Sequence, residues 1–329
     1  MCSIKDVAKH ANVSVTTVSR VLNDFPNISA KTRQKVLDSI TALDYHPDYM
    51  ARSLSKQQSL IIGVIIPDCS HPFFAELVKH IEMTAENNGY KILLCNSLND
   101  EKKERSYINM LKEKRVAGII MGSHLINTDF YQSIHRPIIT FDRYLGDNIP
   151  YIGSDNFTGG QLATQHLIDS GCKSLLHISG SHQLHTQANK RSDGFKITCI
   201  ENNINYQILE YQYAQLTFDY YYEYIKTTVS PLLSEIDGVF CSNDILAYAL
   251  YVYCTNHDIS VPKTLKIVGY DYCQFTRLLQ HPRITTIAQP IPIIGELLSK
   301  NIIQMIEDGE THNVYSQTLG VKLVKGITT

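Results

Sequence analysis

The segment Ser3–Asn23 constrains the fold of this chain most strongly, because it predicts two short helices joined by a tight turn. A capping box opens the first helix: the Ser3 side chain can accept a bond from the backbone of Asp6, and the Asp6 carboxylate can bond back to Ser3. Ser14 is a favourable N-cap for the second helix. The apolar residues that recur at helical spacing are Ile4, Val7, Ala8 and Ala11, then Val18, Val21 and Leu22. The two helices are therefore predicted to pack together on this apolar side.

The second helix leaves an outer face whose side chains suit contact with bases and phosphates. These outer residues are Val15, Thr16, Thr17, Ser19 and Arg20. A third predicted helix, capped by Ser29, completes a small three-helix core with an apolar wall made of Val36, Leu37, Ile40 and Leu43. The pattern predicts a helix-turn-helix DNA reader, and a helical hairpin with a solvated polar face is the alternative.

Charge is distributed unevenly along the 329 residues, whose formal net charge is −2. Residues 1–60 carry a net charge of +3 and the remainder carries −5. A basic head on an acidic body fits a head that binds phosphate groups. Hydrophobic residues make up 43% of the chain, which is typical of a folded protein, and the length suits two or three domains.

The sequence lacks the signals that are typical of secreted proteins, membrane proteins, metal-binding proteins and several classes of enzyme. It has no apolar run of signal-peptide length and no 18 consecutive apolar residues, so we expect a cytoplasmic protein that does not engage a membrane. The eight cysteines are dispersed without a CxxC pair, which predicts reduced, mostly buried thiols and no metal site. Neither GxxxxGK[ST] nor GxSxG occurs, so we expect neither an enzyme nor a cofactor.

From Leu60 onward, buried strands alternate with helices. The first set of predicted strands is LIIGVIIP, YKILLCN, VAGIIMG and PIITF, separated by helices over 73–88, over 100–114 and near 129. The second set is SLLHIS, a strand near Ile208, GVFCSN and LKIVGYD, with helices over 156–170, 189–202, 218–229 and 244–256. Continuous Ile/Val runs between helices indicate parallel sheets covered on both faces. The predicted fold is an all-α head followed by an α/β body of two doubly wound lobes.

The stretches IKDVAKHANVSVTTVSRVLN and YHPDYMARSL resemble the DNA-binding head and hinge of the LacI/GalR family of transcriptional regulators almost position for position. The resemblance implies a head over 1–47, a hinge helix and linker over 48–59, and a body like the periplasmic binding proteins. The family's chain crosses back near RITTIAQP. The first lobe would therefore comprise 60–155 and 289–318, including the helix Ile291–Asp308, and the second lobe 156–288 and 319–329. A homodimer reading a palindromic operator is also implied.

The resemblance implies that the outer residues of the second helix contact double-stranded DNA. Val15, Thr16 and Arg20 would read base edges in the major groove, and Ser14, Thr17, Ser19 and Asn23 would lie nearer the phosphates. Val15 can offer an apolar contact, for example to a thymine methyl group. Arg20 could bind guanine with two hydrogen bonds.

The segment Asp48–Lys56 is too short to be a stable isolated helix in water. The resemblance implies that it folds when two subunits place their copies side by side in the minor groove, with Leu54 as an apolar wedge between base steps. A flexible linker with Leu54 tucked against the body is the alternative when DNA is absent. Folding on binding would make this segment a switch.

Polar and aromatic side chains at the carboxyl ends of the predicted strands are candidates for ligand binding, because ligands bind there in open α/β sheets. In the order that the family implies, they are Phe73, Phe74, Asp142, Arg143, Arg191, Asn243 and Asp271, with Leu216 or Phe218 as a side wall. Carboxylates, a guanidinium fork and an amide can each engage two sugar hydroxyls, while aromatic rings cover the apolar ring faces. Each residue has a structural alternative, and Asp244 fits a helix N-cap better than Asp271 does.

The sequence therefore predicts a repressor of a carbohydrate-utilisation operon that a small sugar effector releases from its operator. Overall resemblance to sucrose-operon repressors suggests sucrose or a related fructoside. A global carbon-catabolite regulator with a phosphoprotein corepressor is one alternative, and a non-enzymatic sugar-binding protein is another. The sign of the response stays open, because purine-type members of the family bind DNA better with their ligand.

Overall fold

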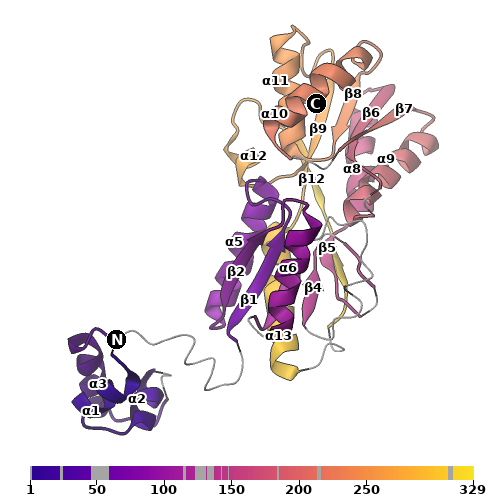
Figure 1. Ribbon diagram of the computed structural model, residues 1–329. Helices are drawn as coiled ribbons and strands as arrows, with labels where there is room; N and C mark the ends of the chain where they lie inside the picture. Colours follow the sequence, from indigo (N-terminus) through magenta and orange to yellow (C-terminus); the bar gives the residue numbers. More distant parts are fainter. Residues whose placement is uncertain are drawn as a thin grey trace. The chain divides into compact units, whose positions relative to one another are not determined.

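The structure is a computed structural model of the 329-residue chain (Figure 1). It describes residues 2–22, 25–45, 59–113, 116–122, 131, 137–141, 143–146, 148–183, 185–212, 216–309 and 314–329. The chain divides into two compact units, Met1–Ser59 and Leu60–Thr329. The hinge segment and the helix predicted near residue 129 lie outside the described residues.

The first unit is a three-helix head made of α1 (Ile4–His10), α2 (Val15–Leu22) and α3 (Ala30–Ala42). The predicted caps are confirmed: the side chains of Ser3, Ser14 and Ser29 each accept a bond from the backbone three residues later. The core residues of the head are Val7, Ala8, Ala11, Val18, Val21, Val36 and Tyr45. The prediction for Leu37 is wrong, since its side chain is 43% exposed. Val36 takes the core position, and the next residue of a helix turns away from it.

The described part of the second unit contains a four-stranded and a six-stranded sheet. The first has the order β2-β1-β3-β4 and is parallel throughout, with β1 (Ile61–Ile66), β2 (Lys91–Asn96), β3 (Gly118–Met121) and β4 (Ile138–Thr140). The second has the order β12-β10-β9-β8-β6-β7 and is made of β6 (Ser174–Gly180), β7 (Asn205–Tyr211), β8 (Gly238–Cys241), β9 (Lys266–Asp271), β10 (Thr285–Ala288) and β12 (Lys322–Val324). Only β12 runs antiparallel to its neighbour among these described strands.

A short parallel pair, β5 (Ile152–Ser154) with β11 (Gln317–Leu319), joins segments far apart in sequence. The sequence did not indicate this pair, because each strand has only three residues. Just before β11 lies α13 (Ile291–Asp308), which packs on α5 (Pro72–Asn87) and on β3 and β4 of the first sheet (Figure 1). A tight contact supports this position: a Cβ built at Gly118 would lie only 2.9 Å from Ile302. The C-terminal part of the chain therefore covers the first sheet with α13 and adds the strand β12 to the second.

The remaining helices are α6 (Glu101–Lys112), α8 (Asn156–Asp169), α9 (Lys190–Glu201), α10 (Phe218–Tyr224), α11 (Asp244–Asn256) and α12 (Gln274–Leu278). The helix predicted over 218–229 changes to a π-helical turn at Ile225–Val229. Among the described residues, no helix has the length and apolarity needed to cross a membrane. Six of the eight cysteines are buried and none forms a disulfide.

The helices α8 and α9 approach each other backbone to backbone. A Cβ built at Gly160 of α8 would lie 2.2 Å from the carbonyl oxygen of Arg191, and one built at Gly194 of α9 would lie 2.2 Å from that of Phe157. Neither oxygen can move without displacing its helix. The absence of a side chain at Gly160 and Gly194 therefore sets the position of Arg191.

We expect Gly160→Ala to lower the free energy of unfolding by about 1–3 kcal/mol, because the added methyl group forces the two helices apart. Urea unfolding followed by circular dichroism measures this loss. Gly320→Ala is the matched control, since a Cβ built at Gly320 meets no atom within 4 Å. Equal stability of the two variants would contradict the tight helix contact.

Candidate functional site

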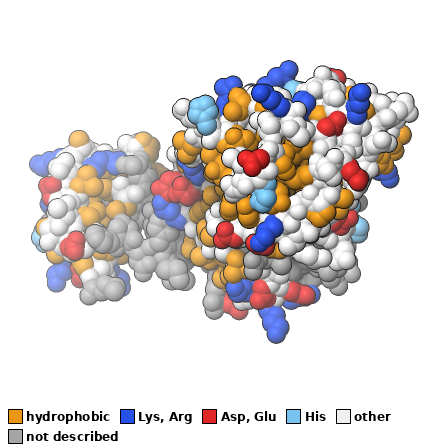
Figure 2. All heavy atoms as spheres, turned by 90° about the horizontal axis from the view of Figure 1, so that it is seen from above, with side chains coloured by type: hydrophobic (Ala, Val, Ile, Leu, Met, Phe, Trp, Pro, Cys, Tyr) orange, Lys and Arg blue, Asp and Glu red, His pale blue; other side chains and the backbone are white. Residues whose placement is uncertain are grey.

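The head exposes the predicted reading face of α2. Val15 is 40% exposed, Thr16 and Arg20 are also exposed, and Thr17 and Ser19 are half-buried. The guanidinium of Arg20 lies 5.7 Å from the centre of the Phe25 ring. Figure 2 shows Lys and Arg side chains on the visible surface of the head. Asn23 and Leu54 lie outside the described residues.

Within the second unit, a cavity lies where the carboxyl ends of strands from both sheets meet. The empty space in and above it measures about 770 Å³, including space open to solvent. Six of the nine predicted ligand residues line it: Phe73, Phe74, Arg191, Leu216, Asn243 and Asp271. Most of the residues predicted to bind a ligand therefore lie around one cavity.

Arg191 is the most firmly held of these side chains. Its Nε donates to Oδ1 of Asn156 (2.8 Å), and its Nη1 donates to the carbonyl oxygen of Ser242 (2.6 Å). The guanidinium lies 3.6 Å from the centre of the Tyr270 ring, a cation–π contact. Three neighbours thus fix the plane of the guanidinium at the cavity wall.

Asp271 ends β9 and is 4% exposed. Burial raises the pKa of its carboxyl to about 8, although the nearby Arg191 acts in the opposite direction. Oδ1 of Asp271 accepts a bond from Nε2 of Gln289 (2.7 Å). The backbone at Asp271 and Tyr272 has φ values of 117° and 53°, which non-glycine residues rarely adopt and which are common at functional sites.

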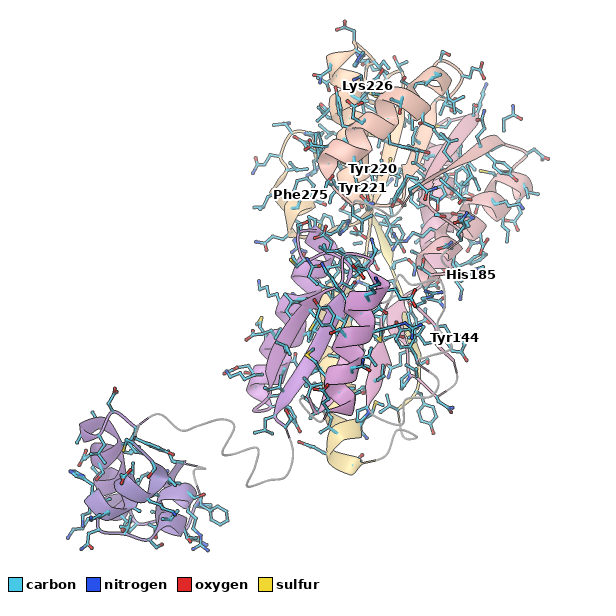
Figure 3. All side chains as sticks on the ribbon, in the orientation of Figure 1. Tyr144, His185, Tyr220, Tyr221, Lys226 and Phe275 are labelled. Atoms are coloured by element: carbon cyan, nitrogen blue, oxygen red, sulfur yellow. The ribbon has the colours of Figure 1, made fainter. Side chains whose placement is uncertain are left out.

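Asn243 contributes to the cavity and also caps α11. Its Oδ1 accepts a bond from the backbone of Leu246 (2.9 Å), and its Nδ2 donates to the hydroxyl of Tyr221 from α10 (3.0 Å), labelled in Figure 3. The N-cap alternative, which suits Asp244 better than Asp271, applies to neither aspartate, because Asn243 is the N-cap. Asp244 is the first residue of α11, and its buried carboxylate accepts bonds from the Thr286 hydroxyl (2.6 Å) and the Tyr272 backbone (2.8 Å).

Aromatic rings from the first sheet's side complete the cavity. The rings of Phe73 and Phe74 meet edge to face at 5.3 Å, and Phe74 lies 6.2 Å from Phe141. Phe74 is 5% exposed, so it belongs to the hydrophobic core as well as to the cavity wall. Leu216 is also buried, and lines the wall formed by the second sheet's side.

Two other predicted residues, Phe218 and Arg143, do not line the cavity. Phe218 stacks on Tyr222 of its own helix and packs against Tyr248 of α11, each at 6.0 Å between ring centres. Arg143 is buried and is not among the residues that line the cavity, and its carbonyl oxygen accepts a bond from the Thr140 hydroxyl (2.6 Å). Asp142 lies outside the described residues.

Several other residues line the cavity that were not among the predicted ligand residues. They include His71, Ser154, Asn156, Ser179, Tyr211 and Gln289. Ser179 and Tyr211 belong to the last residues of β6 and β7, so the strand-end rule could have found them. Ser154 and Gln289 lie on connections between the sheets, which periodicity does not reveal.

A contact near the cavity joins α5 to α12. The buried carboxylate of Glu76 accepts a bond from the backbone of Gln274 (2.5 Å) and from Nη2 of Arg277 (2.7 Å). Phe73 and Phe74 lie on the same helix as Glu76, so the cavity wall and this ion pair share α5. Among the described residues, no group of three or more His, Cys, Asp or Glu side chains is placed to hold a metal ion.

A helical head that exposes a reading face, joined to a two-sheet body with a polar and aromatic cavity, defines a ligand-responsive DNA-binding regulator. Residues 3–48 match the model of the bacterial regulatory proteins of the lacI family, and residues 59–325 match that of the periplasmic binding proteins and sugar binding domain of the LacI family. The chain belongs to the LacI family of transcriptional regulators. The family resemblance and the fold class predicted from sequence are confirmed.

Individual relatives match over nearly the whole length. The chain is 40% identical to the sucrose operon repressor of Pediococcus pentosaceus, covering 99% of this chain and 98% of the relative. It is 36% identical to the ribose operon repressor of Halalkalibacterium halodurans, covering 100% and 97%. A regulator from Alkaliphilus metalliredigens, solved in complex with D-xylulofuranose, is 32% identical with a TM-score of 0.74, covering 82% of this chain and 99% of that one.

The two buried carboxyls near the cavity predict a pH dependence of stability. Burial raises the pKa of Asp271 to about 8 and that of Asp244 to about 6. The folded protein therefore keeps protons that the unfolded chain has released, and stability falls as the pH rises from about 4 to about 8.

We expect Asp271→Asn to make this decline shallower, because the amide has no charge to bury. Urea unfolding of the unliganded protein at several pH values between about 5 and 8.5 measures the slope. Asp219→Asn, at an exposed site of α10, is the control and should keep the wild-type slope. A wild-type slope in Asp271→Asn would show that Asp271 is ionised throughout.

Proposed function

We propose that this chain represses a carbohydrate-utilisation operon as a cytoplasmic homodimer and leaves its operator when a small sugar binds in the cavity. The observation that carries this proposal is the convergence of Arg191, Asn243 and Asp271 with two phenylalanine rings around one cavity. An Arg fork, an amide and a carboxyl group engage hydroxyls, while aromatic rings cover apolar ring faces. The chain would act by binding, not by catalysis.

The charges around the cavity favour a neutral ligand over a sugar phosphate. Among the described residues that line it, Arg191 supplies the one guanidinium and no lysine is present. Asn156, Ser242 and Tyr270 already engage that guanidinium. A phosphate would need more cationic donors than this arrangement offers.

A furanose ring is the sugar unit we favour, with sucrose or a related fructoside as the candidate effector. The similar regulator from Alkaliphilus metalliredigens was solved with D-xylulofuranose, and the named relatives include sucrose and ribose operon repressors. Fructose in sucrose and xylulose in that complex are both ketoses in the furanose form. A global regulator with a phosphoprotein corepressor is the second candidate function, and no described contact favours it.

For DNA recognition, we assign base contacts to Val15, Thr16 and Arg20 of α2. Ser14, Thr17, Ser19 and Asn23 would then lie nearer the phosphates, and Leu54 would be the minor-groove wedge. The exposed part of α2 supports this assignment for the described residues.

Sugar binding would change the angle between the two lobes through α5. This helix carries Phe73 and Phe74 at the cavity and Glu76 in the contact with α12. A new lobe angle would separate the hinge segments of the dimer, so that Leu54 loses its paired place in the minor groove. Sugar and operator would then oppose each other by a coupling of typically ~1–3 kcal/mol.

The first experiment is a titration of the protein onto its upstream palindrome at fixed salt, with sucrose, fructose, ribose, maltose or sugar phosphates. We expect one neutral sugar to weaken specific binding and to leave nonspecific binding unchanged. Tight specific binding that no sugar alters would contradict the role of the cavity. A corepressor or protein partner would then replace the sugar.

Arg20→Ala should weaken operator binding by about 1–3 kcal/mol and relax specificity at one base pair, because a bidentate contact to guanine is lost. Binding to a set of operators with single base changes measures both effects. Lys35→Ala is the control for charge, since this exposed residue of α3 lies on another helix of the head. Uniform weakening on every operator would make Arg20 a phosphate contact instead.

A further inference from the structure

A cluster of hydrogen-bonding side chains connects a partly exposed histidine to the cavity wall. Ser179, near the end of β6, lines the cavity and is 4% exposed. Its hydroxyl lies 3.3 Å from Nε2 of His182 and 3.0 Å from the hydroxyl of Ser192 on α9. The His182 side chain is 37% exposed, and its Nδ1 lies 3.4 Å from a carboxylate oxygen of Glu210 on β7. A change of charge at His182 can therefore reach the cavity through Ser179.

The buried ring of His177 determines where one proton of this cluster lies. Its Nδ1 is 2.9 Å from the carbonyl oxygen of Phe240, which can only accept, so Nδ1 carries the ring proton. Burial lowers the pKa of His177 to about 3, and the neutral ring therefore keeps a lone pair on Nε2. Among the described residues, the one donor that reaches this nitrogen is the Ser192 hydroxyl, at 3.1 Å. The single proton of Ser192 therefore goes to His177 and not to Ser179, because the nitrogen would otherwise be buried without a partner.

With a neutral His182, both serine protons are bound inside the cluster. The Nδ1–H of His182 faces the Glu210 carboxylate, which leaves a lone pair on Nε2. Because the Ser192 proton is held by His177, Ser179 supplies the proton that Nε2 of His182 accepts. Ser179 then offers the cavity only the lone pairs of its oxygen.

Protonation of His182 adds a proton to the cluster and removes an acceptor. Both ring nitrogens then donate, Nδ1 to Glu210 and Nε2 to the Ser192 oxygen 3.0 Å away. Ser179 can no longer donate to His182, so its proton becomes available to an acceptor in the cavity. The charge of His182 thus decides whether the cavity wall offers a hydrogen-bond donor at Ser179.

We propose that His182 is a positioning residue that controls the donor capacity of Ser179, so that the protein holds its effector more tightly when His182 is protonated. This inference rests on the proposed function, because it assumes a sugar in the cavity. The ring and glycosidic oxygens of a sugar only accept hydrogen bonds, and such an oxygen meets a donor at Ser179 only in the protonated state. By linkage, sugar binding takes up a proton at His182, and affinity rises as the pH falls through the titration of this histidine.

The other titratable and charged groups around His182 lie on β6, β7, α9 and α10. Glu210 favours the imidazolium of His182, while Arg191 of α9 is a fixed cation that acts on His177. The Tyr224 hydroxyl of α10 donates to the carbonyl of Glu210 (3.2 Å) and stays neutral, because burial raises its pKa to about 12. Histidine is the side chain that ordinarily changes charge between about pH 5 and 8, and His177 is kept neutral, so His182 is the switch of this cluster.

Calorimetry on the full-length protein at about pH 5.5 and about pH 8 tests the proposal with the tightest binder among sucrose, fructose and ribose. Asp271 also titrates at the cavity, and its effect is common to all variants, so the ratio of affinities at the two pH values is compared between variants. The ratio of low-pH to high-pH affinity should be about 2- to 10-fold larger for the wild type than for His182→Gln, because one hydrogen bond to the sugar depends on the imidazolium. Buffers of different ionisation enthalpy should show that the wild type takes up more protons than the variant.

His185→Gln is the matched control, since His185 is an exposed histidine in the same connection between β6 and α9 (Figure 3). It should keep the wild-type ratio. Ser179→Ala should lose the same pH-dependent component as His182→Gln, because it removes the hydroxyl through which His182 acts. A merely structural role of His182 would weaken the sugar equally at both pH values.

NMR of histidine-labelled wild type gives a readout that does not depend on a variant's stability. Saturating sugar should raise the titration midpoint of the His182 ring, whose signal is identified by its loss in His182→Gln. A wild-type ratio in His182→Gln, or a midpoint that sugar does not raise, overturns the role of His182 and leaves the proposed function intact. Failure of every sugar to bind the wild type overturns both.

Discussion

The close contact between α8 and α9 is the constraint on which the ligand site depends. Gly160 and Gly194 let the two backbones touch, and this contact brings Arg191 of α9 against Asn156 of α8. The guanidinium then also bonds to the end of β8 and stacks on Tyr270 of β9. One side chain thus connects two helices and two strands at the wall of the cavity.

Much of this arrangement could be predicted from sequence, because the relevant signals are local. The capping serines of the head and the apolar strands of the body depend on neighbours within a few residues. The strand-end rule brought Asn243 and Asp271 to one cavity because parallel strands share the edge at which they end, whereas Arg191, in the first turn of α9, was predicted from the family resemblance. Family resemblance supplied the order of these residues along the chain.

The remaining features depend on contacts between distant segments. Phe218 is an aromatic residue of the kind that lines sugar sites, but its ring packs against Tyr222 and Tyr248 instead. No sequence pattern distinguishes an aromatic ring at a ligand cavity from one packed against other rings. The cap of α11 shifted by one residue because the Asp244 carboxylate binds hydroxyls from two later segments. Ser154 has no local signal at all, since its burial depends on a strand that follows about 160 residues later.

The crossing of the chain between the two sheets also affects how the protein can be made. The first sheet is covered by α13, which ends at Asp308, so the ribosome has synthesised every residue up to Asp308 before that sheet gains this helix. Until then, the apolar face of β3 that Ile302 covers is open to water or to other proteins. Nascent chains of this architecture therefore depend on early protection of the first sheet, and the second sheet receives its edge strand β12 later still.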